Sequence, residues 1–230
     1  MRSLTNFTTL KRKITYCDRK GKTLMGNMTL EDVNNMYLDV LKEIGNIGAG
    51  NATTAIANML GIKIDMNVPN IKLMEVSQLG TAVGAEDQTI VGIFLEVQND
   101  IDGSMMFLLD IPSARYLVNK LMMTDAPDDE PFGELELSAL KEIGNIIAGS
   151  YLSALSSMTN LVIAPSIPYI AVDMAASILS VPAIEFGLQG DNALLIQTEI
   201  CAEVAIDGYF ILMPEQGSYE KILTSLGISI

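Results

Sequence analysis

Two short stretches of this chain each place a glutamate three residues before an asparagine, within almost the same sequence. Residues 42–50 are Lys-Glu-Ile-Gly-Asn-Ile-Gly-Ala-Gly, and residues 141–149 are Lys-Glu-Ile-Gly-Asn-Ile-Ile-Ala-Gly. Eight of the nine positions are identical, so we infer that the chain contains an internal duplication. The side chains in these stretches that could carry out chemistry are Glu43, Asn46, Glu142 and Asn145.

A carboxamide beside a carboxylate could serve phosphoryl transfer. The carboxamide can hold a water molecule in line with a phosphorus atom, and phosphoryl transfer depends mainly on positioning and charge neutralisation. The carboxylate can pair with a lysine of an incoming protein. The chain has no His, which excludes His acid–base catalysis and His metal ligation. Its glycines at 45, 48 and 50 match neither a phosphate-binding loop nor a dinucleotide fingerprint.

Each stretch is predicted to lie in the middle of a long helix, because apolar residues recur around it at helical spacing. We expect these helices from Thr29 to about Leu60 and from about Glu134 to Met158. Residues three apart then share one helix face. Glycine inside a helix costs about 1 kcal/mol relative to alanine. We therefore expect another backbone, that of the partner helix, to approach these glycines closely.

The duplicated pattern extends beyond the nine residues. It reads Asp39-x3-Glu43-x2-Asn46-x22-Pro69 in the first copy and Ser138-x3-Glu142-x2-Asn145-x22-Pro168 in the second, with identical spacing. Asp39, Ser138, Pro69 and Pro168 are thus supporting motif residues. Two structural interpretations stay open at this point. The Glu–Asn pairs could form hydrogen bonds between the two helices, or they could belong to an ordinary solvated helix face.

After each helix the sequence predicts a strand that ends at the motif proline, then a hairpin, then a shorter helix. The expected strands are 62–68, 90–97 and 104–109, then 161–167, 193–200 and 209–213, with hairpin turns at Asp102-Gly103 and Asp207-Gly208. The shorter helices are expected at 113–122 and 219–226. The predicted fold is α+β, a single pseudo-two-fold domain at 28–230 with a mostly antiparallel sheet packed by long helices. Its halves cover about 28–123 and 134–230, on either side of an acidic linker.

Charge and composition narrow the function classes. Residues 1–27 carry seven of the 14 basic residues and one acid, whereas the remainder has a formal charge of −20. The basic tail is predicted to be disordered or to reflect a misassigned start, with a basic docking arm as the alternative. The acidic body should bind neither nucleic acid nor an anionic membrane. The two cysteines form no metal or disulfide pattern and predict a reducing cytoplasm. The apolar stretch 161–188 contains Asp173 and three prolines, so it is a poor membrane span.

The twice-repeated pattern resembles the signature of the CheC family of bacterial chemotaxis phosphatases, which is related to CheX and to domains of flagellar switch proteins. The resemblance covers about residues 28–230. It implies that the substrate is the aspartyl-phosphate of a CheY-type response regulator. It also implies that Asn46 and Asn145 orient the attacking water, and that Glu43 and Glu142 pair with the lysine of the receiver. No cofactor is implied for this chain, because the receiver is expected to bring its own Mg²⁺. A CheD-type receptor deamidase is the further partner that the family implies.

Two function classes follow from the sequence. The first is an enzyme that hydrolyses phosphorylated CheY. The second is a non-enzymatic adaptor, either in the flagellar switch or bound to CheD, that senses phosphorylated CheY. Intact Glu–Asn pairs in both copies favour the enzyme. The difference between Asp39 and Ser138 leaves open whether the two sites are equal.

Overall fold

The computed structural model describes residues 30–83, 87–185 and 192–227. The basic tail and Thr29 lie outside the described residues. The elements are, in order, α2 (Leu30–Leu60), β1 (Asp65–Glu75), η1 (Val76–Gln78), α3 (Leu79–Val83), β2 (Thr89–Asn99), β3 (Gly103–Asp110), α4 (Ile111–Met122), α5 (Glu134–Thr159), β4 (Ile163–Pro165), β5 (Tyr169–Met174), α6 (Ala175–Glu185), β6 (Asn192–Cys201), β7 (Ala205–Pro214) and α7 (Gln216–Ser225).

The strands form one seven-stranded sheet in the order β1-β6-β7-β3-β2-β4, with β5 also paired to β2. Every strand pair in it is antiparallel. The prediction of an α+β fold with a mostly antiparallel sheet packed by long helices is confirmed. The two long helices and the hairpin of β2 and β3 lie close to their predicted positions.

The two halves of the chain exchange strands within this sheet. Strand β1 of the first half pairs with β6 of the second, and β4 and β5 of the second half pair with β2 of the first. Strands β3 and β7 meet in the middle, where Phe107 lies opposite Phe210 and their ring centroids are 5.9 Å apart. Because each half completes the sheet of the other, the halves form one interlocked unit.

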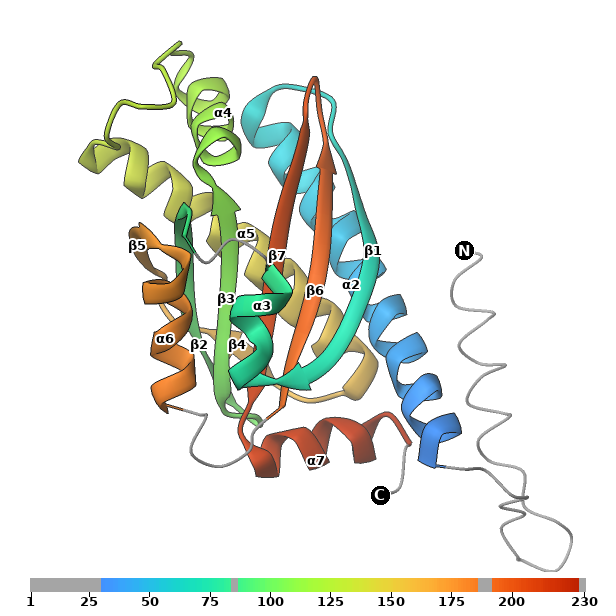
Figure 1. The fold of residues 1–230 in the computed structure, drawn as a ribbon. Coiled ribbons are helices and arrows are strands. Elements are labelled where there is room, and N and C mark those ends of the chain that lie inside the picture. The colour runs from blue at the N-terminus through green and yellow to red at the C-terminus, as the bar shows by residue number, and fades with distance from the viewer. Residues whose placement is uncertain (1–29, 84–86, 186–191, 228–230) are drawn as a thin grey trace, which may run out of the picture.

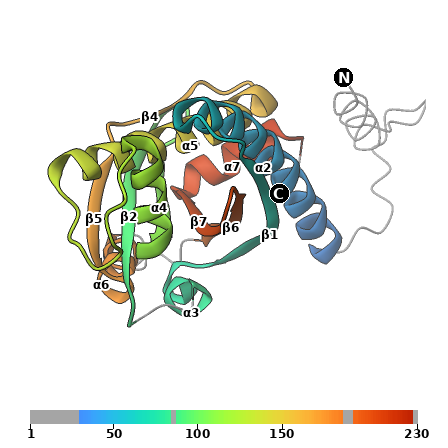
Figure 2. The same ribbon diagram turned by 90° about the horizontal axis from the view of Figure 1, so that it is seen from above.

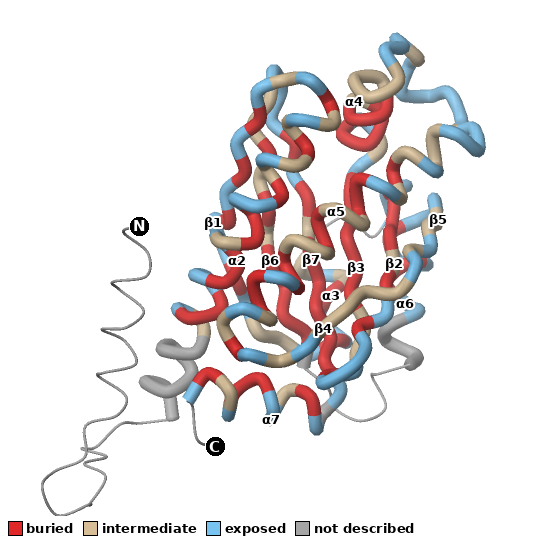
Figure 3. Tube along the Cα trace, turned by 180° about the vertical axis from the view of Figure 1, so that it is seen from behind, coloured by how far each residue is buried: buried red, intermediate tan, exposed pale blue. Residues whose placement is uncertain are grey.

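Helices cover both faces of the sheet. Helices α2 and α5 lie side by side over one face, and the short α3 and α6 lie over the other (Figures 1 and 2). The larger cluster of buried apolar residues lies beneath α2 and α5, and a smaller one lies beneath α3 and α6. Figure 3, seen from the side of the long helices, shows buried positions facing the sheet and exposed positions on the outer turns. The outer face of α2 and α5 is therefore open to a partner.

Among the glycines of the two long helices, Gly48 is the one at which the backbone of the other helix comes closest. A Cβ atom built on Gly48 would lie 2.9 Å from the Cα of Tyr151 in α5. The expected approach of the partner backbone is thus confirmed at this position. It is wrong for Gly50 and Gly149, which have no atom within 4 Å of a built Cβ. It is also wrong for Gly45, which faces side chains of β1, and for Gly144, which faces the side chain of Ile93 in β2.

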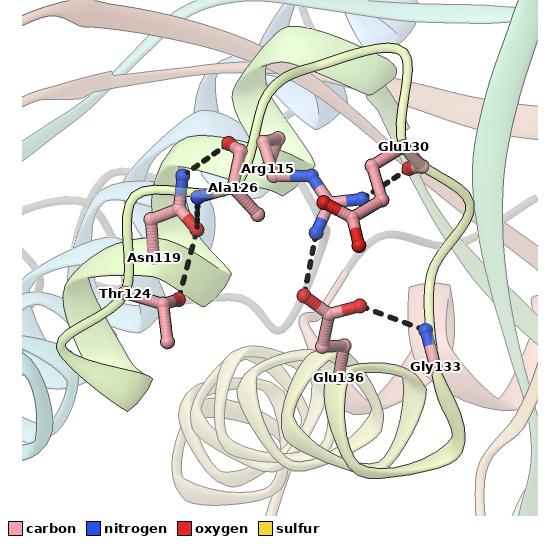
Figure 4. Close-up of polar contacts among 7 residues, drawn as sticks. All are labelled: Arg115, Asn119, Thr124, Ala126, Glu130, Gly133 and Glu136. Carbon is pink, nitrogen blue, oxygen red and sulfur yellow. Dashed lines mark hydrogen bonds and ion pairs between the residues drawn. The ribbon is translucent and has the colours of Figure 1, made fainter.

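The acidic linker between the halves is anchored by a buried arginine of α4 (Figure 4). Arg115 is 1% exposed and donates to the Glu136 carboxylate at 2.5 Å and to the carbonyl of Glu130. Its guanidinium lies 4.1 Å from the ring centre of Phe132. The Glu136 carboxylate also accepts from the N–H of Gly133, so one ion pair fixes both the linker and the start of α5.

Three strand predictions were wrong in detail. Strand β1 does not end at Pro69 but continues to Glu75, because a register shift between Asn67 and Asn70 accommodates the proline. The second hairpin turns between Cys201 and Ala205, not at Asp207-Gly208. Strand β4 is only three residues long, and β5 and α6 follow it where no element was expected.

Candidate functional site

The second copy of the pattern lines a depression on the molecular surface, between α5 and the segment that joins β4 to β5. The depression has a volume of about 370 Å³. Its lining includes Ser138, Lys141, Glu142, Asn145, Ile167 and Pro168. All four residues of the second pattern are therefore brought together, although Pro168 is distant from the others in sequence.

The side chains of this depression differ in exposure in a useful way. Glu142 is exposed, whereas Asn145, one helical turn further into α5, is half-buried. A half-buried carboxamide has fewer orientations available than a fully solvated one, and an exposed carboxylate can reach a partner at little desolvation cost. The arrangement can hold a water molecule at the floor and a cation at the rim.

The first copy lies on α2 in the same order. Asp39, Glu43 and Asn46 are all exposed on this helix, and Pro69 is exposed on β1, the strand against which α2 packs. The motif residues of the first half are thus exposed on two elements that pack against each other. Asn46 is more solvated than Asn145.

The Glu–Asn pairs do not join the helices to each other. Across residues 30–83, 87–185 and 192–227, none of the four side chains takes part in a hydrogen bond or an ion pair. The contact of α2 with α5 instead includes the approach of Gly48 to Tyr151. The interpretation as inter-helix hydrogen bonds is therefore wrong. The polar groups of both pairs are free to bind an external partner.

Sequence reasoning missed part of the lining of the depression. Pro165, Ser166 and Ile167 line it beside the predicted Pro168, and Lys141 lines it beside Glu142. Lys141 belongs to the repeated nine residues, and Ser166 and Ile167 directly precede the motif proline. Their positions next to motif residues were the available signal.

Two further properties of the described residues bear on the class of site. Within the described ranges, no group of three or more cysteine, aspartate or glutamate residues is arranged to hold a metal ion. No helix in this part of the chain is long and apolar enough to cross a membrane.

Known proteins resemble this chain in sequence. Residues 36–73 and 135–170, which contain the two copies of the helical motif, match the model of the CheC-like family. The chain is 36% identical to the CheY-P phosphatase CheC of Bacillus subtilis over 84% of its own length and 95% of that protein. It is 26% identical to the flagellar motor switch phosphatase FliY of the same organism, over 56% of this chain and 34% of FliY.

Solved structures share the fold at lower identity. Thermotoga maritima FliY superposes with a TM-score of 0.69 at 20% identity, over 86% of this chain and 97% of that one. The middle domain of FliM from H. pylori superposes with a TM-score of 0.62 at 13% identity, over 86% and 99%. These likenesses confirm the fold.

Proposed function

This chain belongs to the CheC-like family, and on that premise we propose that it is a phosphatase that hydrolyses the aspartyl-phosphate of a CheY-type response regulator. The observation that carries the proposal is the match to a CheY-P phosphatase along 95% of that protein's length. The two unbonded Glu–Asn pairs on the open face of α2 and α5 support it, because a receiver domain needs such an accessible surface.

Asn145 is the proposed water-orienting group of the second site. Its carboxamide holds a water molecule in line with the phosphorus of the receiver's phosphoaspartate. The water oxygen forms the new P–O bond while the bond from phosphorus to the aspartyl oxygen breaks. Inorganic phosphate leaves, and the receiver's aspartate is regenerated. The half-buried position of Asn145 supports this role, since a restrained carboxamide loses less entropy when it positions water.

Glu142 is the proposed docking group of the same site. Its exposed carboxylate pairs with a lysine of the receiver and fixes the receiver over the depression. Its lack of a partner among the described residues supports this role. The Mg²⁺ that neutralises the phosphoryl group is proposed to belong to the receiver, and this chain is proposed to need no cofactor of its own.

Asn46 and Glu43 take the same roles in the first site, with Asp39 and Pro69 in the supporting positions. Ser138 and Pro168 support the second site, whose depression they line. A CheD-type deamidase remains a proposed further partner, and we assign it no residues. The adaptor remains the alternative function, in which the same surface binds phosphorylated CheY without hydrolysing it.

The experiment is to follow the decay of a phosphorylated CheY-type receiver with and without this protein. The wild type should accelerate the decay, and the Asn46→Ala/Asn145→Ala double variant should abolish the acceleration while its fold and most of its receiver binding remain. Binding without faster decay would refute the enzyme and favour the adaptor. Loss of folding in the double variant would show that the asparagines are structural.

A further inference from the structure

The wall of the second depression carries an unusually exposed apolar side chain. Ile167 lines the depression together with Glu142 and Asn145, and 92% of it is exposed to solvent. It also lines a neighbouring depression of about 440 Å³ on the other side of the same segment, next to Phe94 and Tyr169. Ile167 therefore stands as a ridge at the edge of the candidate site. A large exposed apolar group in such a place favours contact with a partner.

The backbone holds Ile167 in a fixed position. The adjacent Ser166 donates its N–H to the Glu96 carbonyl of β2 at 2.9 Å, and its hydroxyl accepts from the Glu96 N–H at 2.9 Å. Pro165 and Pro168 flank the pair, and a residue directly before proline is restricted to extended conformations. The side chain is thus presented on a rigid segment, so binding a partner there costs little ordering entropy.

The first half places the equivalent side chain inside the protein. The duplication aligns Ile167 with Val68, since each directly precedes the motif proline. Val68 is 4% exposed, and its methyl groups lie beside Gly45 of α2. The first site therefore has no such ridge, although its Glu–Asn pair has the same spacing.

We propose that Ile167 is a docking residue for the receiver at the second site. This inference rests on the proposed function and extends it. Ile167 inserts into an apolar surface next to the receiver's phosphoaspartate while Glu142 pairs with the receiver's lysine, so that Asn145 meets the phosphorus. Ile167 acts on binding and orientation and does not touch the reacting atoms. The two sites consequently differ in receiver affinity, and the difference lies in the strand segment before each proline.

The test measures KM and kcat for hydrolysis of a phosphorylated CheY-type receiver in the Asn46→Ala background, which leaves the second site alone. Ile167→Ser should raise KM roughly tenfold, because it removes the burial of one large apolar side chain, and should leave kcat within about twofold. Ile167→Val should restore most of the affinity. Val162→Ser is the matched control, because Val162 is 65% exposed but lies outside the depression, so its KM should not change.

Each other outcome has a definite meaning. An unchanged KM in Ile167→Ser, an equal rise in Val162→Ser, or a fall in kcat without a rise in KM would overturn the docking role and leave the proposed function intact. Loss of all activity in the Asn46→Ala background, with the wild type active, would also overturn it, because the second site would then be silent. An inactive wild type would instead refute the proposed function itself. Melting curves of the variants provide the folding control, since Ile167 contributes little buried area.

Discussion

Gly48 in α2 lies against the backbone of Tyr151 in α5, so that a Cβ atom on Gly48 would come within 2.9 Å of the Tyr151 Cα. It is the single position of the nine-residue repeat at which the copies differ, with Ile147 as its counterpart. Ile147 is fully buried. The two copies thus differ where the two helices must pass each other. They are identical at the Glu–Asn pairs, whose side chains form no hydrogen bond between the helices.

Gly48→Ala should lower the free energy of unfolding. Alanine gains up to about 1 kcal/mol over glycine in a helix interior, but overpacking against a backbone costs about 1–3 kcal/mol, because the Tyr151 main chain cannot move away as a flexible side chain would. With the full alanine gain subtracted, the net change should be destabilising by up to about 2 kcal/mol, measured by urea unfolding.

Gly50→Ala is the control for this substitution. Gly50 lies two residues further along the same helix, is exposed, and has no atom within 4 Å of a built Cβ. The Gly50→Ala substitution should therefore stabilise the protein by up to about 1 kcal/mol. Equal effects of the two substitutions would mean that the helices do not approach at Gly48 as described.

The ion pair between Arg115 and Glu136 is buried, so removing its carboxylate should cost more stability than removing the carboxylate of an exposed ion pair. Glu136→Gln should destabilise the protein by about 3 kcal/mol or more, because it leaves a guanidinium that is 1% exposed without its carboxylate. The same change also weakens the bond to the Gly133 N–H. Thermal unfolding followed by circular dichroism measures the loss.

Glu203→Gln removes the carboxylate of the other ion pair found among the described residues, that with Lys120. Both of its members retain substantial solvent contact, at 33% and 66% exposure, and exposed pairs contribute little. The Tm of Glu203→Gln should therefore stay at the wild-type value. A Glu136→Gln protein as stable as Glu203→Gln would refute the anchoring role of Arg115.

Periodicity and turn residues predicted the helices and the first hairpin. A glycine, however, can be required for a reason other than a turn. Asp207-Gly208 has the sequence of a hairpin turn, yet Gly208 lies inside β7. A Cβ on Gly208 would lie 2.9 Å from Cε2 of Phe107. Glycine is needed there because an aromatic ring of the neighbouring strand covers it. That reason depends on a residue about a hundred positions away, which local patterns do not contain.

The candidate site could be predicted from the sequence as far as its motif residues, and no further. Spacing placed Glu142 and Asn145 on one helix face and linked them to Pro168. It gave no means of separating Ile167 from Val68, since both are β-branched apolar residues before a proline. The strand segments decide between them: β1 continues through its proline, whereas the corresponding segment of the second half is interrupted between β4 and β5.

The phenol of Tyr151 should make the stability of the protein depend on pH in the alkaline range. Burial raises the pKa of its phenol from 10.0 to about 12, although its hydrogen bond with Thr198 opposes the rise. Because the folded pKa lies above the unfolded one, this stabilisation is fully present below pH 10 and is lost as the pH rises from about 10 to about 12. The loss amounts to about 3 kcal/mol.

Tyr151→Phe should remove this part of the pH dependence while it keeps the ring that stacks on Phe210 at 4.7 Å. Urea unfolding between pH 9 and pH 12 compares the two proteins. Tyr169→Phe, which removes an exposed phenol, should retain the wild-type loss. Identical curves for wild type and Tyr151→Phe would contradict the buried, neutral phenol.

Glu142 predicts how receiver binding depends on salt if its exposed carboxylate pairs with the receiver's lysine. In the Asn46→Ala background, Glu142→Gln should raise KM by roughly threefold to thirtyfold at low ionic strength, since it removes one charge pair at the rim of the depression. Raising the salt from about 0.05 to 0.5 M shortens the screening length to a few ångström, so the wild-type KM should rise towards that of the variant.

Glu134→Gln, at the start of the same helix and outside the depression, is the charge-matched control and should keep most of the wild-type affinity. A KM that rises equally in both variants, or a salt dependence that Glu142→Gln leaves unchanged, would show that the overall acidic charge governs association and that Glu142 has no specific partner.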